Sequence, residues 1–229
     1  MVIELSEGFI DEVRRRVIEW FREKGDRELP WRRTRDEWAI VLAAMLLRVT
    51  RRDVVARVYN KLLERYPDPK AMASASVEEV REVIRPLGLY NVRAKQLVEL
   101  ARALVERFNG EVPCDREKLL ELPGIGDYAA SVILLRACNQ PTPLLDSNTV
   151  RVYERLLGYK TRTQNPYRDE LLVKLAEALT PRDPEEAYEF NLGVMDLGFK
   201  VCTTRFRCFE CPLRDLCYYY ARSVERGVA

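Results

Sequence analysis

Four cysteines near the C-terminal end have the spacing of a metal-binding loop. They follow the pattern C-x5-C-x2-C-x5-C and are Cys202, Cys208, Cys211 and Cys217. Thiols this close together in an intracellular protein favour a zinc ion or an iron–sulfur cluster over disulfides. Zinc ribbons usually carry two C-x2-C pairs and this loop carries one, so the spacing leaves both kinds of centre open. Cys114 and Cys138 lie apart from this loop, and we interpret them as ordinary buried thiols.

The absence of histidine narrows the chemistry that the 229-residue chain can perform. It excludes Ser-His-Asp and Cys-His catalysis and every metal site that needs an imidazole. Acid–base chemistry must therefore come from carboxylates, Tyr, Lys or Cys. One candidate carboxylate is Asp146 in the segment PLLDSNTV, just before an expected helix. An aspartate at that position can equally be a helix N-cap, and the residues alone favour the cap.

The segment LPGIGDY joins two expected helices through a glycine turn. Gly124 and Gly126 allow the backbone to turn sharply and to approach a ligand closely. The helix that begins near Asp127 leaves N–H groups without partners at its start, and such groups attract anions. A helix-hairpin-helix of this kind can grip a backbone phosphate of a nucleic acid, although a plain tight turn accounts for the same residues.

Composition and charge are those of a globular protein. Hydrophobic residues make up 47% of the chain and charged residues 32%. No apolar run approaches the roughly 18–20 residues of a membrane span, and the N-terminal segment lacks the layout of a signal peptide, so we expect an intracellular, cytoplasmic protein. The net charge is only +2, but arginines gather in one segment: Arg32, Arg33, Arg35, Arg48, Arg51 and Arg52. These arginines either bind phosphate or form solvated ion pairs on a helix face.

The hydrophobic pattern is helical over most of the chain. Apolar residues recur at spacings of three and four, and no alternating strand pattern longer than a few residues occurs. The sequence therefore predicts an all-α fold with about ten helices in two lobes. The expected helices are 9–22, 38–50, 53–65, 77–85, 92–108, 116–120, 128–138, 148–157, 168–179 and 185–195. We place one domain at 30–137, with the helix-hairpin-helix, and a second at 1–29 and 138–229, with the cysteine loop.

LPGIGDYAA followed by LLDSNTVRV resembles the helix-hairpin-helix (Gly/Pro…Asp) DNA glycosylases, with Asp146 lying 18 residues after Tyr128. The resemblance runs from PWR at 30–32 to the last cysteines and is closest to the thymine/uracil mismatch glycosylases related to adenine glycosylase and endonuclease III. It implies a six-helix barrel in the domain at 30–137. It also implies a [4Fe–4S] cluster on the four cysteines, although the first cysteine loop is one residue shorter than in the family. The implied partner is double-stranded DNA with a mispaired or damaged base, bound by a monomer at the nucleoid.

The resemblance assigns catalytic roles to two residues. The family aspartate that matches Asp146 faces the deoxyribose of the target nucleotide and stabilises the positive charge that develops on the sugar. Tyr128 stands where strand-cutting members carry a lysine that forms a Schiff base, which implies a monofunctional enzyme. An aromatic core residue is the alternative interpretation of Tyr128. Lys95 and Lys118 are other amines, but neither matches the family position.

The resemblance also assigns DNA contacts, and it has one clear departure. The phosphate clamp comprises Leu122, Gly124, Ile125 and Gly126. Arg48 and Thr50 match the region that relatives wedge into the space left by a flipped base, and Leu89 and Tyr90 match the loop that probes the opposite strand; all four can also be core residues. Ala44 stands where adenine-removing and thymine-mismatch relatives carry a glutamate.

The leading hypothesis is therefore a monofunctional glycosylase that removes thymine or uracil mispaired with guanine. The alternatives are adenine removal, a lysine-dependent lyase activity, and a catalytically idle protein that binds DNA through the hairpin. Ala44 cannot protonate a departing base as a glutamate could. This weakens the adenine hypothesis most, because unprotonated adenine is a poorer leaving group than a thymine or uracil anion.

Overall fold

The computed structural model describes residues 5–48, 50–205 and 207–225. Within these ranges the chain forms helices and loops and no strand, which confirms the all-α prediction. The chain divides into two compact units, one of Glu28–Gln140 and one of Met1–Arg27 with Pro141–Ala229. The boundaries expected from the sequence, after residues 29 and 137, lie a few residues from these. Each unit is described by itself below.

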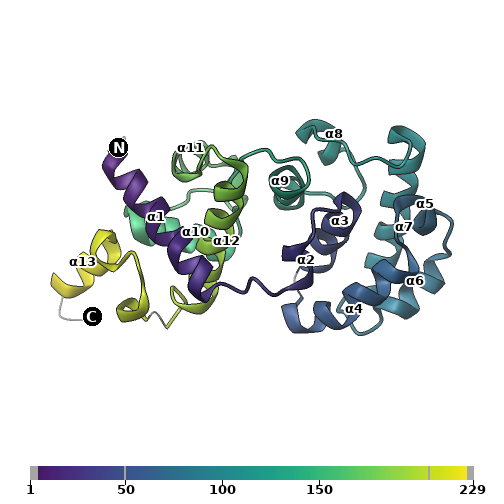
Figure 1. Cartoon of the computed structure of the whole chain (residues 1–229), viewed down its shortest axis with the longest axis horizontal. Coiled ribbons are helices and arrows are strands. Elements are labelled where there is room, and N and C mark those ends of the chain that lie inside the picture. Colours follow the sequence, from purple (N-terminus) through teal and green to yellow (C-terminus); the bar gives the residue numbers. More distant parts are fainter. Residues whose placement is uncertain (1–4, 49, 206, 226–229) are drawn as a thin grey trace. The chain divides into compact units, whose positions relative to one another are not determined.

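Figure 1 shows the helices of both units along the chain. The unit of residues 28–140 contains α2 (Pro30–Arg33), α3 (Glu37–Leu46), α4 (Arg52–Arg65), α5 (Pro69–Ala73), α6 (Val77–Ile84), α7 (Tyr90–Phe108), α8 (Arg116–Leu120) and α9 (Asp127–Arg136). The other unit contains α1 (Glu7–Lys24), α10 (Ser147–Leu157), α11 (Glu170–Leu179), α12 (Pro184–Lys200) and α13 (Tyr218–Glu225), with 3-10 turns η1 (Pro166–Arg168), η2 (Cys208–Glu210) and η3 (Arg214–Leu216). The expected ten helices missed α2, α5 and α13, because two are only about one turn long and α13 opens with three tyrosines, which are weak helix formers.

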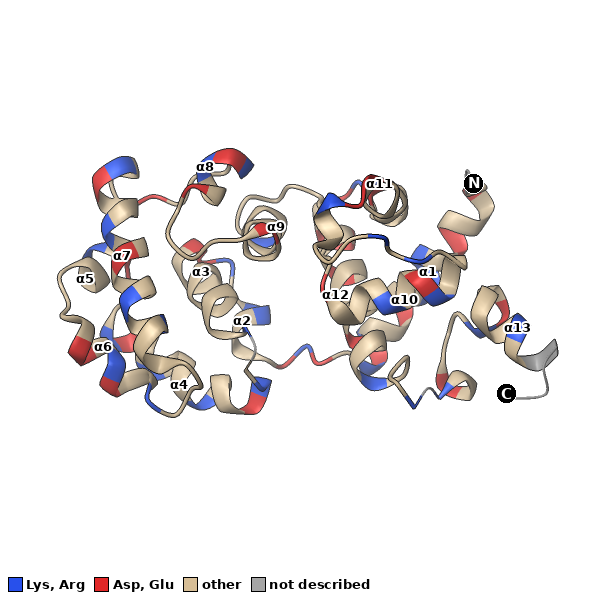
Figure 2. Ribbon diagram, turned by 180° about the vertical axis from the view of Figure 1, so that it is seen from behind, with Lys and Arg blue, Asp and Glu red and all other residues tan. Residues whose placement is uncertain are grey.

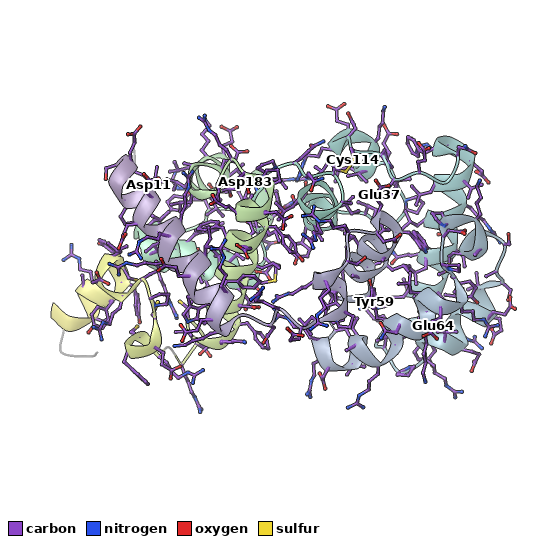
Figure 3. All side chains as sticks on the ribbon, viewed as in Figure 1. Asp11, Glu37, Tyr59, Glu64, Cys114 and Asp183 are labelled. Atoms are coloured by element: carbon purple, nitrogen blue, oxygen red, sulfur yellow. A yellow bond between two sulfur atoms is a disulfide. The ribbon has the colours of Figure 1, made fainter. Side chains whose placement is uncertain are left out.

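Helix α3 is the centre of the unit of residues 28–140. Every residue from Trp38 to Leu46 is buried, and the helix packs against α4, α7 and α9. Two polar side chains in this core have backbone partners: the Trp38 indole donates to the Tyr66 carbonyl at 2.9 Å, and the Tyr59 hydroxyl (Figure 3) donates to the Ala39 carbonyl at 3.1 Å. Because its partners surround it on all sides, α3 is apolar around its whole circumference.

The expected helix 38–50 was too long at its C-terminal end. Helix α3 ends at Leu46, and Leu47 is its C-cap. The carbonyls of Met45 and Leu46 accept hydrogen bonds from the buried side chain of Arg93, which replaces the next helical turn. The segment that contains Arg48 and Thr50 is therefore a loop.

In the second unit α12 packs against α1 and α10, and α11 packs against α1. Its core includes Val17, Tyr153 and Phe190. Gly198 allows α12 to lie against the start of α10, because a Cβ atom there would approach the Asn148 carbonyl oxygen to 2.6 Å. A bulkier residue at 198 would therefore displace the start of α10. In the described part of the chain, no helix has the length and apolar character needed to cross a membrane.

Candidate functional site

Helices α8 and α9 form a hairpin joined by the glycine turn at residues 122–126. Gly124 has a φ of +79°, a left-handed backbone conformation that favours glycine. The side chains of Leu122 and Ile125 are buried in the core. Of the residues expected to clamp a phosphate, these two can therefore offer only backbone groups.

The N-terminus of α9 is open to an anion. Its N-cap is Gly126, and no side chain in the described part of the chain caps it. Gly126 is exposed, and a Cβ atom built there has no described neighbour within 4 Å. The first N–H groups of the helix carry partial positive charge, so they present an uncovered anion-binding surface. Arg116 also lies here, donating to Asp127 at 3.1 Å and to Ser131 at 3.0 Å.

The two loops assigned to base probing lie in the same unit as the hairpin. Arg48 is exposed, and its guanidinium donates to the carbonyl of Gly124 at 3.0 Å. Thr50 is half-buried. Leu89 is 67% exposed and has a left-handed backbone with a φ of 58°, whereas Tyr90 is half-buried and packs against the core. An exposed leucine on an unfavourable backbone conformation is an outlier of the kind found at functional sites.

Most other arginines of the segment 32–52 are engaged in the fold. Arg32 is buried, Arg35 donates to Asn139 at 3.0 Å, Arg33 pairs with Glu28, and Arg51 pairs with Asp53 at 3.0 Å. Figure 2 shows acidic residues interspersed with basic ones over both units. The interpretation as ion pairs therefore holds for Arg33 and Arg51, and Arg48 stands out because its side chain meets a carbonyl of the glycine turn.

Asp146 is the N-cap of α10, in the other unit. Its Oδ1 accepts from the backbone N–H of Asn148 at 2.9 Å and of Thr149 at 2.8 Å, and its own N–H donates to the Thr149 hydroxyl at 2.9 Å. The capping role expected from the residues is thus present. It does not compete with a chemical role, because one oxygen serves as the cap and the same bonds fix the direction of the other.

The second oxygen of Asp146 is the end of a hydrogen-bond chain. Oδ2 accepts from the Asn148 side-chain amide Nδ2 at 3.1 Å, and the Asn148 side-chain oxygen Oδ1 accepts from Arg151 at 2.9 Å. Arg151 also donates to the carbonyls of Gly198 and Cys202, both at 2.6 Å. The carboxylate is therefore held from α12 and from the first cysteine of the loop.

Asp146 lines an open hollow of about 640 Å³ on its unit. Its wall also includes one further carboxylate, that of Glu154, and three cations, those of Arg151, Arg155 and Lys160. Such a surface suits a ligand that combines an electron-poor centre with phosphate oxygens.

Comparison with known proteins gives the family. Residues 42–178 match the model of the HhH-GPD superfamily base excision DNA repair protein. The chain belongs to this superfamily. It is 53% identical to the thymine-DNA glycosylase of Aeropyrum pernix, over 94% of this chain and 97% of that protein, and 50% identical to the thymine/uracil-DNA glycosylase of Pyrobaculum aerophilum, over 90% of each. A solved structure of a thermostable thymine-DNA glycosylase superposes with a TM-score of 0.84 at 32% identity, covering 94% of this chain and 96% of that one.

Tyr128 and Ala44 bear on which HhH-GPD chemistry is available. Tyr128 is the second residue of α9 and is half-buried. Ala44 is buried in α3, so this position supplies no carboxyl group. Lys95 and Lys118 are exposed on α7 and α8. The position that would carry a Schiff-base lysine therefore carries a phenol.

The four cysteines of this HhH-GPD chain lie in one loop of the α12–α13 region and form no disulfide. Burial raises the pKa of Cys208 and Cys217 and raises that of Cys211 to about 12, and each value is raised further by others of the four thiols, including Cys202. Arg155 donates to the Cys202 sulfur at 3.3 Å. Among the described residues, no group of three or more Cys, Asp or Glu side chains has an arrangement that could hold a metal ion. The four thiols are nevertheless soft donors of the kind that bind zinc or an iron–sulfur cluster.

The interpretation of Cys114 and Cys138 as buried thiols is wrong. The two residues form a disulfide with a sequence separation of 24 residues (Figure 3). It closes a loop that begins just before α8 and ends just after α9, so it encloses the whole hairpin. Sequence reasoning missed it because it assumed the redox state of an ordinary intracellular protein. Their positions on either side of the hairpin were the available signal.

The sequence also failed to indicate Arg93, Asn148 and Arg151. Arg93 and Arg151 donate mainly to backbone carbonyls, most of them distant in sequence, and such partners leave no motif. Asn148 and Arg151 do lie within LLDSNTVRV, on the turns of α10 nearest Asp146.

Proposed function

We propose that this chain is a monofunctional DNA glycosylase that hydrolyses the N-glycosidic bond of thymine or uracil mispaired with guanine in double-stranded DNA, acting as a monomer on the DNA of the cell interior. The names and high identities of the two archaeal relatives support the substrate class. The observation that carries the mechanism is the fixed Asp146 carboxylate, whose second oxygen is oriented by Asn148.

Asp146 supplies the charge that the reaction needs. As the bond from C1′ to the base lengthens, its electron pair leaves with the base and the sugar becomes cationic. A carboxylate about 4 Å away at an effective dielectric constant of about 20 contributes about 4 kcal/mol. If that attraction develops only in the transition state, it accelerates the reaction about a thousandfold. Water then forms the new bond to C1′, losing a proton, and the departing pyrimidine anion gains one.

The hairpin supplies the grip on the strand. The open N-terminus of α9 binds a backbone phosphate, and this contact is independent of base sequence. The base must leave the stack before it reacts, which costs a few kcal/mol and less at a mismatch. Selectivity for mispairs thus begins with the weaker pairing of the target.

The side chains of Tyr128 and Ala44 limit the outcome. A phenol cannot form a Schiff base, so the product is an abasic site with an intact strand. Position 44 has no carboxyl group to protonate a purine, which favours pyrimidines because their anions are better leaving groups.

The cysteine loop is assigned to a [4Fe–4S] cluster. Cys202, Cys208, Cys211 and Cys217 would hold it, and the Arg155 guanidinium, which donates to the Cys202 sulfur, would face the bound centre. When bound, the cluster would cross-link the loop, with no open ligand position for hydrolysis. Through the Cys202 carbonyl it would also steady Arg151 and the chain that ends at Asp146.

One experiment tests the function. Matched duplexes with G·T, G·U or A·8-oxoguanine are incubated with the protein and analysed before and after alkali. We expect breaks at G·T and G·U only after alkali. Breaks before alkali would remove the monofunctional claim, breaks at A·8-oxoguanine would favour adenine removal, and tight binding without abasic sites would favour an idle DNA-binding protein.

A further inference from the structure

Arg93, in the first turn of α7, is a buried cation that joins two loops. It is only 6% exposed. Its Nη1 donates to the carbonyls of Met45 at 2.8 Å and Leu46 at 2.9 Å, at the end of α3. Its Nε donates to the carbonyl of Gly88 at 2.9 Å, in the loop before α7. One planar guanidinium thus connects α3 to the residue that precedes Leu89.

The same side chain reaches further along the first loop. Its Nη2 donates to the Arg48 carbonyl and, at 2.8 Å, to the Thr50 hydroxyl, which itself donates to the Arg48 carbonyl at 3.1 Å. The Arg48 side chain continues the connection by donating to the Gly124 carbonyl. Leu46, Arg48 and Thr50 after α3, the loop at 88–89 and the glycine turn are therefore tied into one assembly within a single unit.

This arrangement is unfavourable for the cation. Burial, and after it the charge of Arg48, lower the pKa of Arg93. The positive charge also stands in the first turn of a helix, at the wrong end of the dipole. Its hydrogen-bond acceptors in the described part of the chain are carbonyl and hydroxyl oxygens, with no carboxylate to neutralise it. A packed apolar side chain would avoid these costs but could not hold the two loops at a fixed separation.

The loops held in this way present unusual groups to solvent. Leu89 is 67% exposed with a left-handed backbone, and Val92 on the next turn is 56% exposed. Arg48 is the exposed cation of the neighbouring loop. An apolar wedge must keep its position when it enters a base stack, because a wedge that yields does not unstack the bases.

We propose that Arg93 is a positioning residue that fixes the Leu89 loop and the Arg48–Thr50 loop as one rigid probing element, and so sets how well the protein distinguishes a mispair from a normal pair. The proposal rests on the proposed function, since it concerns the probing of duplex DNA. Arg93 touches no DNA; it acts through Gly88, Arg48 and Thr50.

The first test is a binding comparison in an Asp146→Asn background, which separates recognition from turnover. Affinities for G·C and G·T duplexes of matched sequence are measured for the Asp146→Asn parent and for the same protein with Arg93→Lys or Leu89→Ala added. Lysine keeps the charge but not the planar fork. We expect Arg93→Lys to reduce the G·T preference about tenfold and to leave the affinity for G·C duplex within about twofold. Equal losses on both duplexes would show a general structural role and overturn the proposal.

The second test is a double-mutant cycle on single-turnover excision from G·T duplex, with Asp146 intact. A displaced probing loop that disturbs the geometry of the reacting groups should lower the excision rate constant about 100-fold. If Arg93 acts through the Leu89 loop, Arg93→Lys with Leu89→Ala is no slower than the slower single variant. Additive losses would contradict it.

The Thr50→Val variant provides an independent test in case Arg93→Lys fails to fold. It removes one acceptor of Arg93 without changing the size of the side chain, and Nη2 keeps the Arg48 carbonyl as a partner. We therefore expect a melting temperature within about 5 °C of the parent and a severalfold loss of G·T preference. An unchanged preference in both Arg93→Lys and Thr50→Val would also overturn the proposal. Failure of the proposed function is distinguishable, because the unaltered protein would then excise neither thymine nor uracil.

Discussion

Helices α9 and α10 begin in opposite ways, although both starts carry groups that we assign to the reaction. α9 follows a glycine, and no side chain caps it among the described residues. α10 follows Asp146, whose carboxylate accepts two backbone N–H groups. The comparison shows two uses of the same partial charge: unoccupied N–H groups remain available to an external phosphate, whereas occupied ones hold an internal carboxylate in place.

The two starts are also anchored differently. The hairpin that contains α9 is enclosed by the Cys114–Cys138 disulfide. The start of α10 is held by hydrogen bonds that run from Asn148 through Arg151 to α12 and the cysteine loop. A phosphate clamp tolerates a covalent tie at its base, while an oriented carboxylate needs a contact at the oxygen itself.

The largest effect is expected for Asp146→Asn. Asparagine still accepts the N–H groups of Asn148 and Thr149, so α10 keeps its cap. It carries no charge to stabilise a cationic sugar, so excision should fall about a thousandfold while duplex binding persists. Single-turnover excision and fluorescence anisotropy measure the two effects. Excision at the original rate would remove Asp146 from the mechanism.

The second largest effect is expected for loss of the Cys114–Cys138 disulfide, which should lower the stability of the fold and leave the excision rate unchanged. A bond that closes a loop of this length stabilises the folded state by about 3 kcal/mol. Replacing both Cys114 and Cys138 by Ser should therefore lower the melting temperature by about 10 °C. Excision well below the melting temperature should be unchanged. A double variant that melts with the parent would show that the disulfide adds no stability.

Gly126→Asp should separate stability from binding. The backbone at Gly126 is extended and the space beside it is open, so an aspartate can cap α9 and stabilise it by a few tenths of a kcal/mol. The new charge lies where the phosphate is expected, so DNA affinity should fall about 10- to 100-fold. Gly126→Asn is the matched control, because it caps without charge. If both variants bind alike, the phosphate lies elsewhere.

Local signals in the sequence located most of the helices and selected the residues of the candidate site. Periodicity placed α4 within one residue of its start, and the cysteine spacing selected the loop between α12 and α13. Asp146 was found through the motif around it. These features depend on neighbours within a few positions along the chain.

The features that the sequence did not reveal depend on distant partners. The end of α3 was placed too late, because the Arg93 side chain that caps it comes from a residue nearly fifty positions away. The Cys114–Cys138 pairing depends on the hairpin that brings its ends together. A buried arginine and a surface arginine look the same in a sequence, and only packing distinguishes them.

The smallest and most informative effect is expected for Asn148→Ala. The side chain donates to the free oxygen of Asp146 and accepts from Arg151, but the cap bonds of Asp146 to backbone N–H groups do not involve it. Removing the side chain therefore leaves the carboxylate in place, but its second oxygen loses the hydrogen bond that orients it. The loss of one hydrogen bond to a charged group corresponds to about a tenfold fall in the excision rate constant, with duplex affinity unchanged. Ser147→Ala, on the exposed neighbouring residue, is the control for general damage to this turn. A fall in affinity equal to the fall in rate would mean that Asn148 contacts DNA instead of orienting Asp146. The α10 start would then act, like the α9 start, as a binding element.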